Sequence, residues 1–353
     1  MASQITKASL DSINEDVLHL IVEALSLTTF RNEDSKLITG RKSIKMLSSV
    51  NRHMRLVLQP IVFRSISIDV RSWHIALQAL KLVESSQVIG ECMRSFHLRI
   101  YDYARGSFEC VDGIPEAFAS VLNRTPKLDK LSVAVPDYES RSYEVALHSA
   151  EVYLPSVRSL VLSPELPWML DFCPGTNKVS TCKDWPMRRT RPDQHSLDFV
   201  QALARARGVQ TFEMEENWNA DLVQRVHAAM PDLECLAIQG WNQYFQLRDL
   251  LKPLKCFQVL KTLYLPMASE LGIGFHPPDC GNAYMGPNGD EVTKRVEEEQ
   301  RQAEHRALAM ICTACPQLEV LWVANRKMLR PSLEVLAELS KTAFPARPHP
   351  LFD

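Results

Sequence analysis

The stretch Pro231-Asp-Leu-Glu-Cys-Leu-Ala-Ile-Gln239 decides the fold of this chain. Leu233, Leu236 and Ile238 follow a fixed spacing: an apolar residue, two residues, an apolar residue, one residue, an apolar residue. The same spacing returns at six other places, with its first apolar residue at Met93, Leu128, Val157, Val209, Leu260 and Leu318. Four of the copies have a proline two residues before that position, namely Pro126, Pro155, Pro231 and Pro316. Chance does not supply so many copies with shared flanks, so the chain contains an internal repeat.

The rhythm of the repeat predicts an α/β solenoid. Successive first positions are separated by 35, 29, 52, 24, 27 and 58 residues, and the two longest intervals contain insertions at 163–195 and 266–290. Helical patterns precede several copies, at Trp73–Glu84, Pro115–Asn123, Leu197–Arg207, Asp221–Met230 and Glu291–Cys315. Strands that follow helices in this way favour a right-handed solenoid with one parallel sheet on one face and helices on the other.

Strand alternation predicts which side chains form the core and which face outward. The second apolar positions should be almost fully buried, and they are Leu131, Leu160, Phe212, Leu236, Leu263 and Leu321. Because side chains alternate along a strand, the intervening residues should form an outward surface. We predict a target-binding surface there, made of Glu213, Glu215, Gln239, Tyr264 and Trp322, with Trp241 just beyond its strand. Aromatic anchors bordered by acid suit a basic segment of a protein target. In the alternative, Trp241 and Trp322 pack under the insertions.

The first sixty residues follow a different pattern. Apolar residues at helical spacing begin with Val17 and resume with Ile44, on either side of a polar stretch at 28–41 that predicts a loop. Ser12 or Asn14 is expected to cap the first helix. Asn51 is expected to cap a further short helix that ends at Pro60. The alternation from Phe63 to Val70 predicts a half-buried strand.

This segment resembles an F-box, a small three-helix module. The resemblance covers residues 10–68 and rests on three stretches, Ile13-Asn-Glu-Asp-Val-Leu-His-Leu-Ile21, Leu47-Ser-Ser-Val-Asn-Arg52 and Phe63-Arg-Ser-Ile66. Asn14 stands where an F-box usually has proline. The remainder, residues 69–343, is similar to the irregular leucine-rich repeats that often follow an F-box, and residues 1–9 and 344–353 are expected to be flexible.

The resemblance implies a role in ubiquitin transfer. F-box modules dock on the Skp adaptor and through it on a cullin, so the repeats would bind a protein target. The implied adaptor-binding residues are Ile13, Val17, Leu18, Ile21, Leu47, Val50 and Met54. One alternative is a repeat scaffold that uses the adaptor for assembly only.

Composition narrows the other possibilities. The 353 residues carry 40 basic and 42 acidic side chains, a net charge of −2 that gives no electrostatic reason to expect nucleic acid or a membrane as partner. No apolar run is long enough to span a bilayer. The first residues lack the apolar core of a secretory signal. Nine cysteines, mostly in apolar patterns, suit a reduced compartment, either cytoplasm or nucleus.

Enzyme signatures are weak, and we expect a non-catalytic chain without cofactor or metal. Gly272-Ile-Gly274 lacks the third glycine of a dinucleotide-binding loop. Cys312 and Cys315 have metal-ligand spacing but no second pair at a suitable distance, so core packing is favoured. Two alternatives stay open: a zinc clip made by Cys173, Cys182 and His195, and a hydrolase with its site in the two insertions.

Overall fold

The structure is a computed structural model that describes residues 14–27, 30–31, 37–38, 40–101, 112–182, 194–240, 246–275, 277, 284–285, 287–332 and 334–335. Its contacts divide the chain into two units, Met1–Leu131 with Val145–Val152, and Ser132–Glu144 with Tyr153–Asp353. Strand β5 (Lys130–Ala134) and helix α7 (Ser140–Ser149) contribute residues to both. Each unit is described by itself.

The first unit begins with helices and continues into a parallel strand pair. Its other elements are α1 (Glu15–Leu27), β1 (Phe30–Arg31), β2 (Leu37–Ile38), α2 (Gly40–Ser48), α3 (Arg52–Val62), β3 (Ser65–Val70), α4 (Trp73–Ser85), α5 (Gln87–Cys92), β4 (Ser95–Ile100) and α6 (Ile114–Asn123). Strands β1 and β2 pair antiparallel inside the segment predicted to be a loop. Strands β3 and β4 pair in parallel. The predicted division after residue 68 therefore falls inside β3.

The second unit is built from repeated strands. They are β6 (Ser159–Leu162), β7 (Lys178–Thr181), β8 (Thr211–Glu215), β9 (Cys235–Gln239), β10 (Thr262–Leu265), β11 (Val320–Val323) and β12 (Arg326–Leu329). From β6 to β11 each strand pairs in parallel with the next, whereas β12 is antiparallel to β11.

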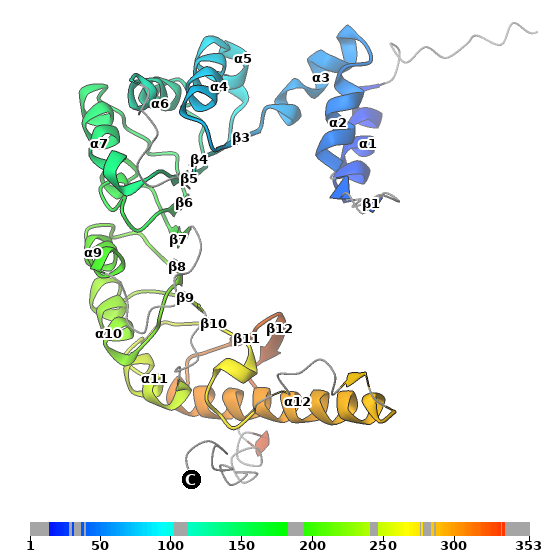
Figure 1. The fold of residues 1–353 in the computed structure, drawn as a ribbon, viewed down its shortest axis with the longest axis vertical. Helices are drawn as coiled ribbons and strands as arrows, with labels where there is room; N and C mark the ends of the chain where they lie inside the picture. The colour runs from blue at the N-terminus through cyan, green and yellow to red at the C-terminus, as the bar shows by residue number, and fades with distance from the viewer. Residues whose placement is uncertain are drawn as a thin grey trace, which may run out of the picture. The chain divides into compact units, whose positions relative to one another are not determined.

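Helices connect these strands and cover one side of them. The unit contains η2 (Asp137–Glu139), α8 (Met169–Phe172), α9 (Gln194–Leu203), α10 (Ala220–Ala229), α11 (Leu247–Leu254), η3 (Ala268–Glu270) and α12 (Gly289–Ala314). Figure 1 shows α9, α10 and α11 along one face of strands β8 to β10. The predicted α/β fold with parallel strands and helices behind them is confirmed in the described residues, and its right-handed sense stays a prediction.

The strand cores follow the predicted alternation. Each of the six second-position side chains is at most 1% exposed: Leu131, Leu160, Phe212, Leu236, Leu263 and Leu321. Burial alternates along β8, where Phe212 and Met214 are buried and Glu213 is not. Every repeat thus buries its apolar residues against the repeats beside it.

A ladder of backbone hydrogen bonds joins successive repeats of the second unit. The carbonyl of the residue just before a strand accepts two consecutive N–H groups from the next repeat. The accepting residues are Arg158, Asn177, Gln210, Glu234 and Lys261. These backbone bonds hold adjacent repeats in register without a ladder of asparagine side chains.

Helix α8 and strand β7 lie within the segment 163–195, which the sequence predicted to be a loop insertion, so that prediction is wrong for residues 169–172 and 178–181. The repeat spacing is present there, but its first and third positions are Thr176 and Thr181 and only Val179 is apolar. Thr176 is 3% exposed, and its hydroxyl donates to the carbonyl of Val157 at 3.5 Å. Thr176 thus fills a buried position, Thr181 stays partly exposed, and the long interval holds two repeats.

The prediction that Pro60 ends its helix is wrong by two residues, because α3 continues to Val62. Pro60 lies in the last turn, where the missing N–H removes only one helical hydrogen bond. The backbone N–H of Phe63 still donates to the carbonyl of Gln59 at 3.0 Å.

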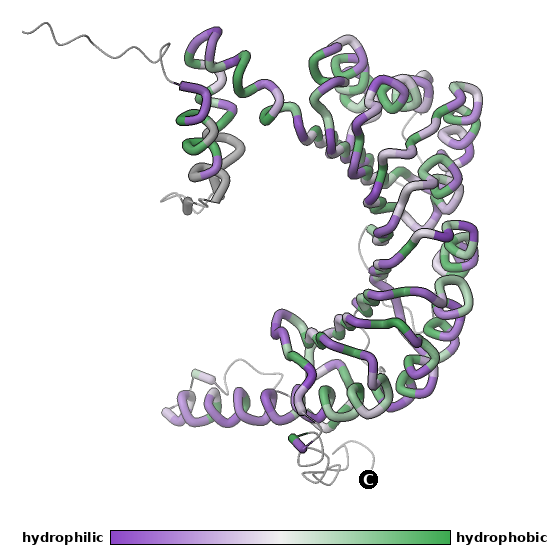
Figure 2. The backbone as a smooth tube through the Cα atoms, turned by 180° about the vertical axis from the view of Figure 1, so that it is seen from behind, coloured by the Kyte–Doolittle hydropathy of each residue, from purple (hydrophilic) through white to green (hydrophobic). Residues whose placement is uncertain are grey.

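Helix α12 differs from the other helices because its first half is exposed. The buried positions of this 26-residue helix lie mainly in its second half, from Ala303 to Cys312. Figure 2 shows hydrophilic residues along the first half. The first half of α12 is therefore a charged surface in contact with water. Among the described residues, no helix combines the length and apolar character needed to cross a bilayer.

Asn51 caps α3 as predicted, since its side-chain oxygen accepts the backbone N–H of Met54 at 2.7 Å. We expect Asn51→Ala to destabilise α3 by about 0.5–2 kcal/mol, because the backbone N–H of Met54 in the first turn loses its hydrogen-bond acceptor. Hydrogen exchange should show faster exchange of α3 amides and no change in α10. Asn219→Ala is the matched control, because Asn219 caps α10 in the same way at 2.8 Å. If Asn51→Ala and Asn219→Ala each reduced protection equally in α3 and in α10, the assignment of Asn51 as the cap of α3 would be contradicted.

Candidate interaction surfaces

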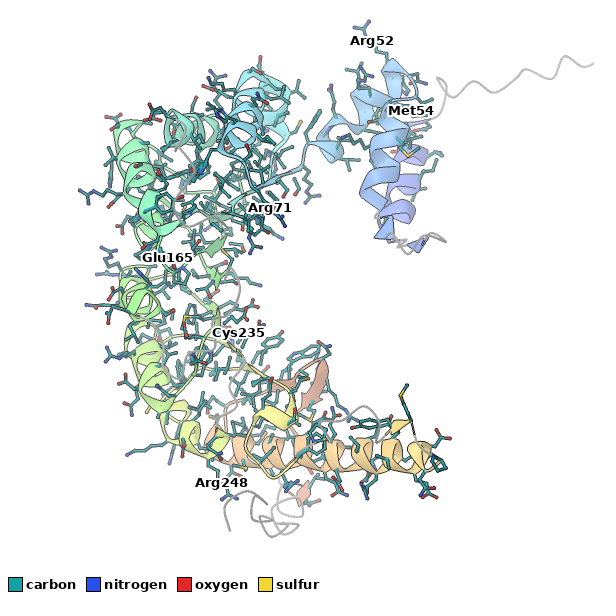
Figure 3. The ribbon with its side chains drawn as sticks, viewed as in Figure 1. Arg52, Met54, Arg71, Glu165, Cys235 and Arg248 are labelled. Atoms are coloured by element: carbon teal, nitrogen blue, oxygen red, sulfur yellow. The ribbon has the colours of Figure 1, made fainter. Side chains whose placement is uncertain are left out.

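The N-terminal module, defined as α1 to α3, has a small core. Five buried side chains form it, namely Leu18, Val22, Ile44, Met54 and Leu58. Leu47 and three residues of the α3 segment pack against this core while staying partly exposed. Figure 3 labels Met54 among the three helices and Arg52 at the outer end of α3. A core this thin gives the module little stability of its own.

Large apolar side chains of the same module are exposed, and we call this set the apolar face. On α1, Val17 is 46% exposed, Leu20 65% and Ile21 38%. These three share one side of the helix, because residues three and four apart are neighbours on a helix surface. The remaining members are Met46, Val50 and Leu56.

The structure separates the predicted adaptor-binding residues into two groups. Val17, Ile21 and Val50 belong to the apolar face, whereas Leu18 and Met54 are 0% exposed. Leu47 is partly buried and packs against the core, and Ile13 lies outside the described residues. The buried pair supports the module, and the exposed residues alone are accessible at its surface.

Asn14 starts α1 in the place where an F-box usually has proline. Its side-chain oxygen accepts the backbone N–H of Asp16 at 2.9 Å, and its carbonyl accepts that of Leu18 at 3.1 Å. These are the bonds of an N-cap residue. Asn14 is therefore the cap that the sequence offered as one of two, and Ser12 lies outside the described residues.

The second surface is the sheet face of the second unit that points away from its core. Strand register sets a line of residues side by side across β7 to β12, and we call it the central row. Its members are Ser180, Glu213, Ala237, Tyr264, Trp322 and Lys327. The neighbouring row on the same face consists of Lys178, Thr211, Cys235, Thr262, Val320 and Leu329. Figure 3 labels Cys235, which locates this row on β9.

The central row contains a stacked aromatic pair. The rings of Tyr264 and Trp322 are nearly parallel, with 9° between their planes and 5.5 Å between their centroids. The Lys327 amine lies 6.0 Å from the centroid of Trp322, a cation–π arrangement. The predicted outward orientation of both aromatic residues is confirmed, and they pack on each other.

Carboxylates border the stack on the β8 side. Glu213 accepts hydrogen bonds from the Gln239 side-chain amide at 2.8 Å and from the Ser180 hydroxyl at 3.2 Å. Glu215 lies one step further along β8 and pairs in register with Gln239. Five of the six predicted residues thus gather on one face, namely Glu213, Glu215, Gln239, Tyr264 and Trp322, while Trp241 lies outside the described residues.

Two groups beside Glu213, the hydroxyl of Tyr264 and the thiol of Cys235, are held neutral. Burial is the main reason why the pKa of Tyr264 is raised, and Cys235 and Glu213 add to the effect. Burial likewise raises the pKa of Cys235, although Lys178 opposes it. Both groups are therefore neutral near pH 7.

Cys312 and Cys315, predicted to be core residues, are buried, and so is Cys173, which the sequence offered as part of a zinc clip. Burial raises the pKa of Cys315 to about 11 and that of Cys173 to about 12, and it also raises the pKa of Cys312. A thiol that burial keeps neutral is a poor nucleophile at pH 7. In the described part of the chain no three His, Cys, Asp or Glu side chains are placed to hold a metal ion.

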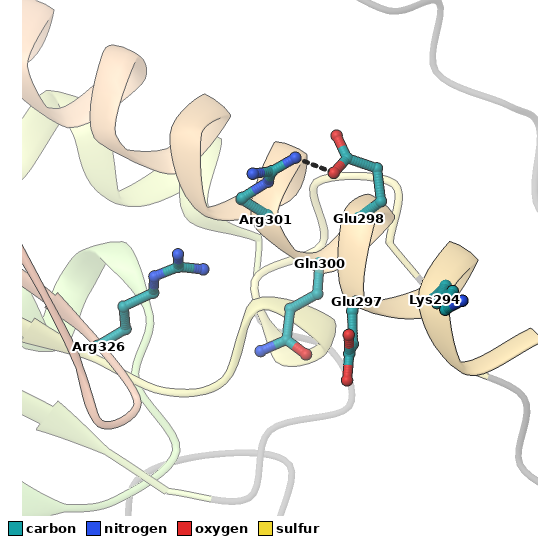
Figure 4. Close-up of a pocket in the computed structure, with 6 residues that line it drawn as sticks. All are labelled: Lys294, Glu297, Glu298, Gln300, Arg301 and Arg326. Carbon is teal, nitrogen blue, oxygen red and sulfur yellow. Dashed lines mark hydrogen bonds and ion pairs between the residues drawn. The ribbon is translucent and has the colours of Figure 1, made fainter. Parts of the chain in front are cut away.

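One open depression of about 470 Å³ lies beside the first half of α12. Figure 4 shows its lining, which consists of Lys294, Glu297, Glu298, Gln300, Arg301 and Arg326. Arg301 pairs with Glu298 across one turn of the helix. Binding sites for small molecules are lined mainly by apolar and aromatic groups. We therefore interpret this depression as solvated helix surface.

Comparisons with known proteins find similarity among solved structures. No protein-family model matches the chain, and no curated protein matches it. Among solved structures, the leucine-rich repeat-containing protein LegL7 from Legionella pneumophila is similar, with a TM-score of 0.42 and 16% identity. The alignment covers 85% of this chain and 89% of that chain. The assignment as a leucine-rich-repeat-like solenoid rests on this chain's own strand register and burial.

Proposed function

We propose that this chain is a non-catalytic substrate receptor of an SCF-type cullin ubiquitin ligase. The N-terminal module binds the Skp adaptor as an F-box does, and the sheet face of the repeats binds a protein target. The apolar face of the module is the observation that carries the proposal. The F-box resemblance of the sequence supplies the class of partner.

Exposure of the apolar face to water is unfavourable in free energy. Val17, Leu20 and Ile21 occupy the outer side of α1. On a helix at a protein surface, the side that faces water usually carries polar and charged residues. Contiguous exposed apolar side chains are typical of protein–protein interaction sites. An adaptor that covers them removes apolar area from water and stabilises a module whose own core is thin.

The mechanism is proximity. A receptor that holds the adaptor at one end and a target at the other raises the effective concentration of target near the conjugating enzyme. This role requires no reactive group in the chain. It requires two surfaces that bind independently.

Ile21→Glu is expected to reduce adaptor binding by about tenfold or more, because it places a charge in the apolar contact. Ile21 is 38% exposed, so the change leaves the core of the module in place. Leu82→Glu is the matched control, since Leu82 is 68% exposed on α4, outside the module. Binding of purified adaptor to immobilised full-length chain measures the effect.

Equal adaptor binding by the Ile21 and Leu82 variants would contradict the proposal. A chain that binds the adaptor but yields no ubiquitinated target in a reconstituted ligase would instead be a scaffold. The scaffold is the second candidate function, and the aromatic stack on the sheet face supports it equally well.

A further inference from the structure

Strand β12 extends the outer face of the sheet by one strand and adds an apolar side chain to it. In register, Leu329 lies beside Val320 and Lys327 lies beside Trp322. Met328, between them on the strand, is 8% exposed and points to the core, so Leu329 and Lys327 point outward. Leu329 is 65% exposed. The hairpin thus leaves a large apolar side chain in water at the end of the sheet.

Leu329 continues an apolar surface that begins with the aromatic stack. We call this surface the C-terminal patch, and its members are Tyr264, Val320, Trp322 and Leu329. They come from three adjoining strands, and Val320 shares its face with Trp322 because side chains alternate along a strand. The first three are partly exposed. Contiguous exposed apolar side chains are typical of protein–protein interaction sites.

The two borders of the C-terminal patch carry charge of opposite sign. Glu213 and Glu215 lie on β8, two strands before the patch begins. Lys327 lies on β12 at the other border. Within the described part of the chain, neither Glu213 nor Lys327 forms an ion pair. Arg326, by contrast, pairs with Glu304 of α12 at 2.7 Å. The outer face therefore runs from acidic through apolar to basic.

The acidic border can accept a basic group from a partner. The carboxylate of Glu213 accepts hydrogen bonds from Gln239 and Ser180, which hold it in one orientation. A carboxylate has about four lone-pair positions, so these bonds leave capacity for a further donor. Lys178 lies on β7, on the side of β8 away from the patch. A partner that crosses the patch therefore meets Glu213 first.

Strand spacing sets the distances along this face. Strands β8 and β12 are four spacings apart, about 19 Å, and Tyr264 and Trp322 lie about 10 Å and 14 Å from β8. An extended chain rises about 3.3 Å per residue and turns every second side chain to the same side. Its first and seventh residues are therefore about 20 Å apart and can both face the sheet. Its third and fifth residues then lie over the aromatic stack.

We propose that the outer face of β8 to β12 binds an extended segment of a target protein with a basic residue, two apolar residues and an acidic residue at alternate positions. The basic residue pairs with Glu213, the apolar residues pack on the C-terminal patch, and the acidic residue pairs with Lys327. A uniformly basic segment fits less well, because it places like charge beside Lys327. The inference rests on the target-binding part of the proposed function and names the pattern that the target must present.

Three seven-residue peptides with blocked ends test this pattern. All carry leucine at positions three and five and serine at the even positions. The first and last residues are lysine and glutamate in the dipolar peptide, two lysines in the basic peptide, and two glutamates in the acidic peptide. Binding to the full-length chain is followed by NMR of leucine methyl groups, in which Leu329 reports from the patch. The dipolar peptide is expected to shift the Leu329 signals and to bind about tenfold more tightly than the other two.

Charge reversal on the protein should redirect this preference. Lys327→Glu is expected to bind the basic peptide about tenfold more tightly than the dipolar peptide, and Glu213→Lys is expected to prefer the acidic peptide by a similar factor. A damaged fold would weaken binding of all three peptides and could not exchange one preference for another. Lys252→Glu is the matched control, because Lys252 is exposed on α11 and its reversal should leave the dipolar peptide preferred.

Truncation of the exposed leucine measures the apolar contact. Leu329→Ala is expected to weaken binding of the dipolar peptide about fivefold, because apolar area that the peptide covers is lost. Val259→Ala is the control for truncation at an exposed apolar residue, since Val259 lies outside the patch and is 40% exposed.

Equal binding of the dipolar and basic peptides by the unchanged chain would overturn the inference. So would the absence of any shift of the Leu329 signals, or a failure of both charge-reversal variants to change the preferred peptide. The measurement uses no adaptor, so loss of the adaptor interaction in the Ile21 experiment would remove the ligase role and leave this site standing.

Discussion

Phe212→Ala is expected to lower the free energy of unfolding of the repeat sheet by about 3–5 kcal/mol. The ring is 0% exposed and faces the core between Val179 of β7 and Leu236 of β9. Its removal takes away buried apolar area and leaves a cavity that tightly packed neighbours fill only in part. Because each repeat is stabilised by its neighbours, the loss should extend to both flanking strands.

Hydrogen exchange of the amides in β7, β8 and β9 measures this effect strand by strand. Val259→Ala is the control, since Val259 is 40% exposed and its truncation should change stability by no more than about 0.5 kcal/mol. If the two truncations cost the same, Phe212 does not belong to a shared core and the solenoid assignment fails.

Leu18→Lys is expected to unfold the N-terminal module, with a loss of about 4 kcal/mol or more. Leu18 is 0% exposed and packs with Met54 and Leu58. The substitution places an ammonium group among apolar side chains with no partner. The module has few other buried residues with which to compensate.

The readout is hydrogen exchange of α1 and α3, with β8 to β10 as an internal reference that should stay protected. Leu20→Lys is the control on the same helix, because Leu20 is 65% exposed and a lysine there remains in water. Preserved protection of α1 in the Leu18 variant would show that the core is assigned wrongly. Leu18→Lys would also abolish adaptor binding through unfolding, which makes Ile21→Glu the better probe of docking.

The strands were predictable where apolar residues fill the repeat spacing. Leu263 and Leu321 were assigned to the core from spacing alone, and both are buried. Strand β7 escaped detection because Thr176 and Thr181 occupy its first and third positions. Threonine can satisfy its hydroxyl with a local backbone carbonyl, so a buried strand position does not require an apolar residue.

The candidate sites were predictable only in part. Alternation placed Tyr264 and Trp322 on the outer face, but their stacking depends on the pairing of β10 with β11, strands separated by a long helix. In α1 the residues Val17, Leu18 and Ile21 are all apolar. The apolar side of the helix is therefore wide, and only the packing of α1 against α2 and α3 decides which of these residues is buried.

Strand β12 has a consequence for how these molecules behave in concentrated solution. It is the last strand at its end of the sheet in the described part of the chain, and it runs antiparallel to the strands before it. A free sheet edge invites pairing with the edge of another molecule, and charged residues there discourage it. Arg326 and Lys327 are both exposed on this strand. Arg326 pairs with Glu304 of α12, and Lys327 leaves an exposed charge on the strand. The hairpin thus ends the array with charged groups that discourage pairing with an identical edge, which favours separate molecules over filaments.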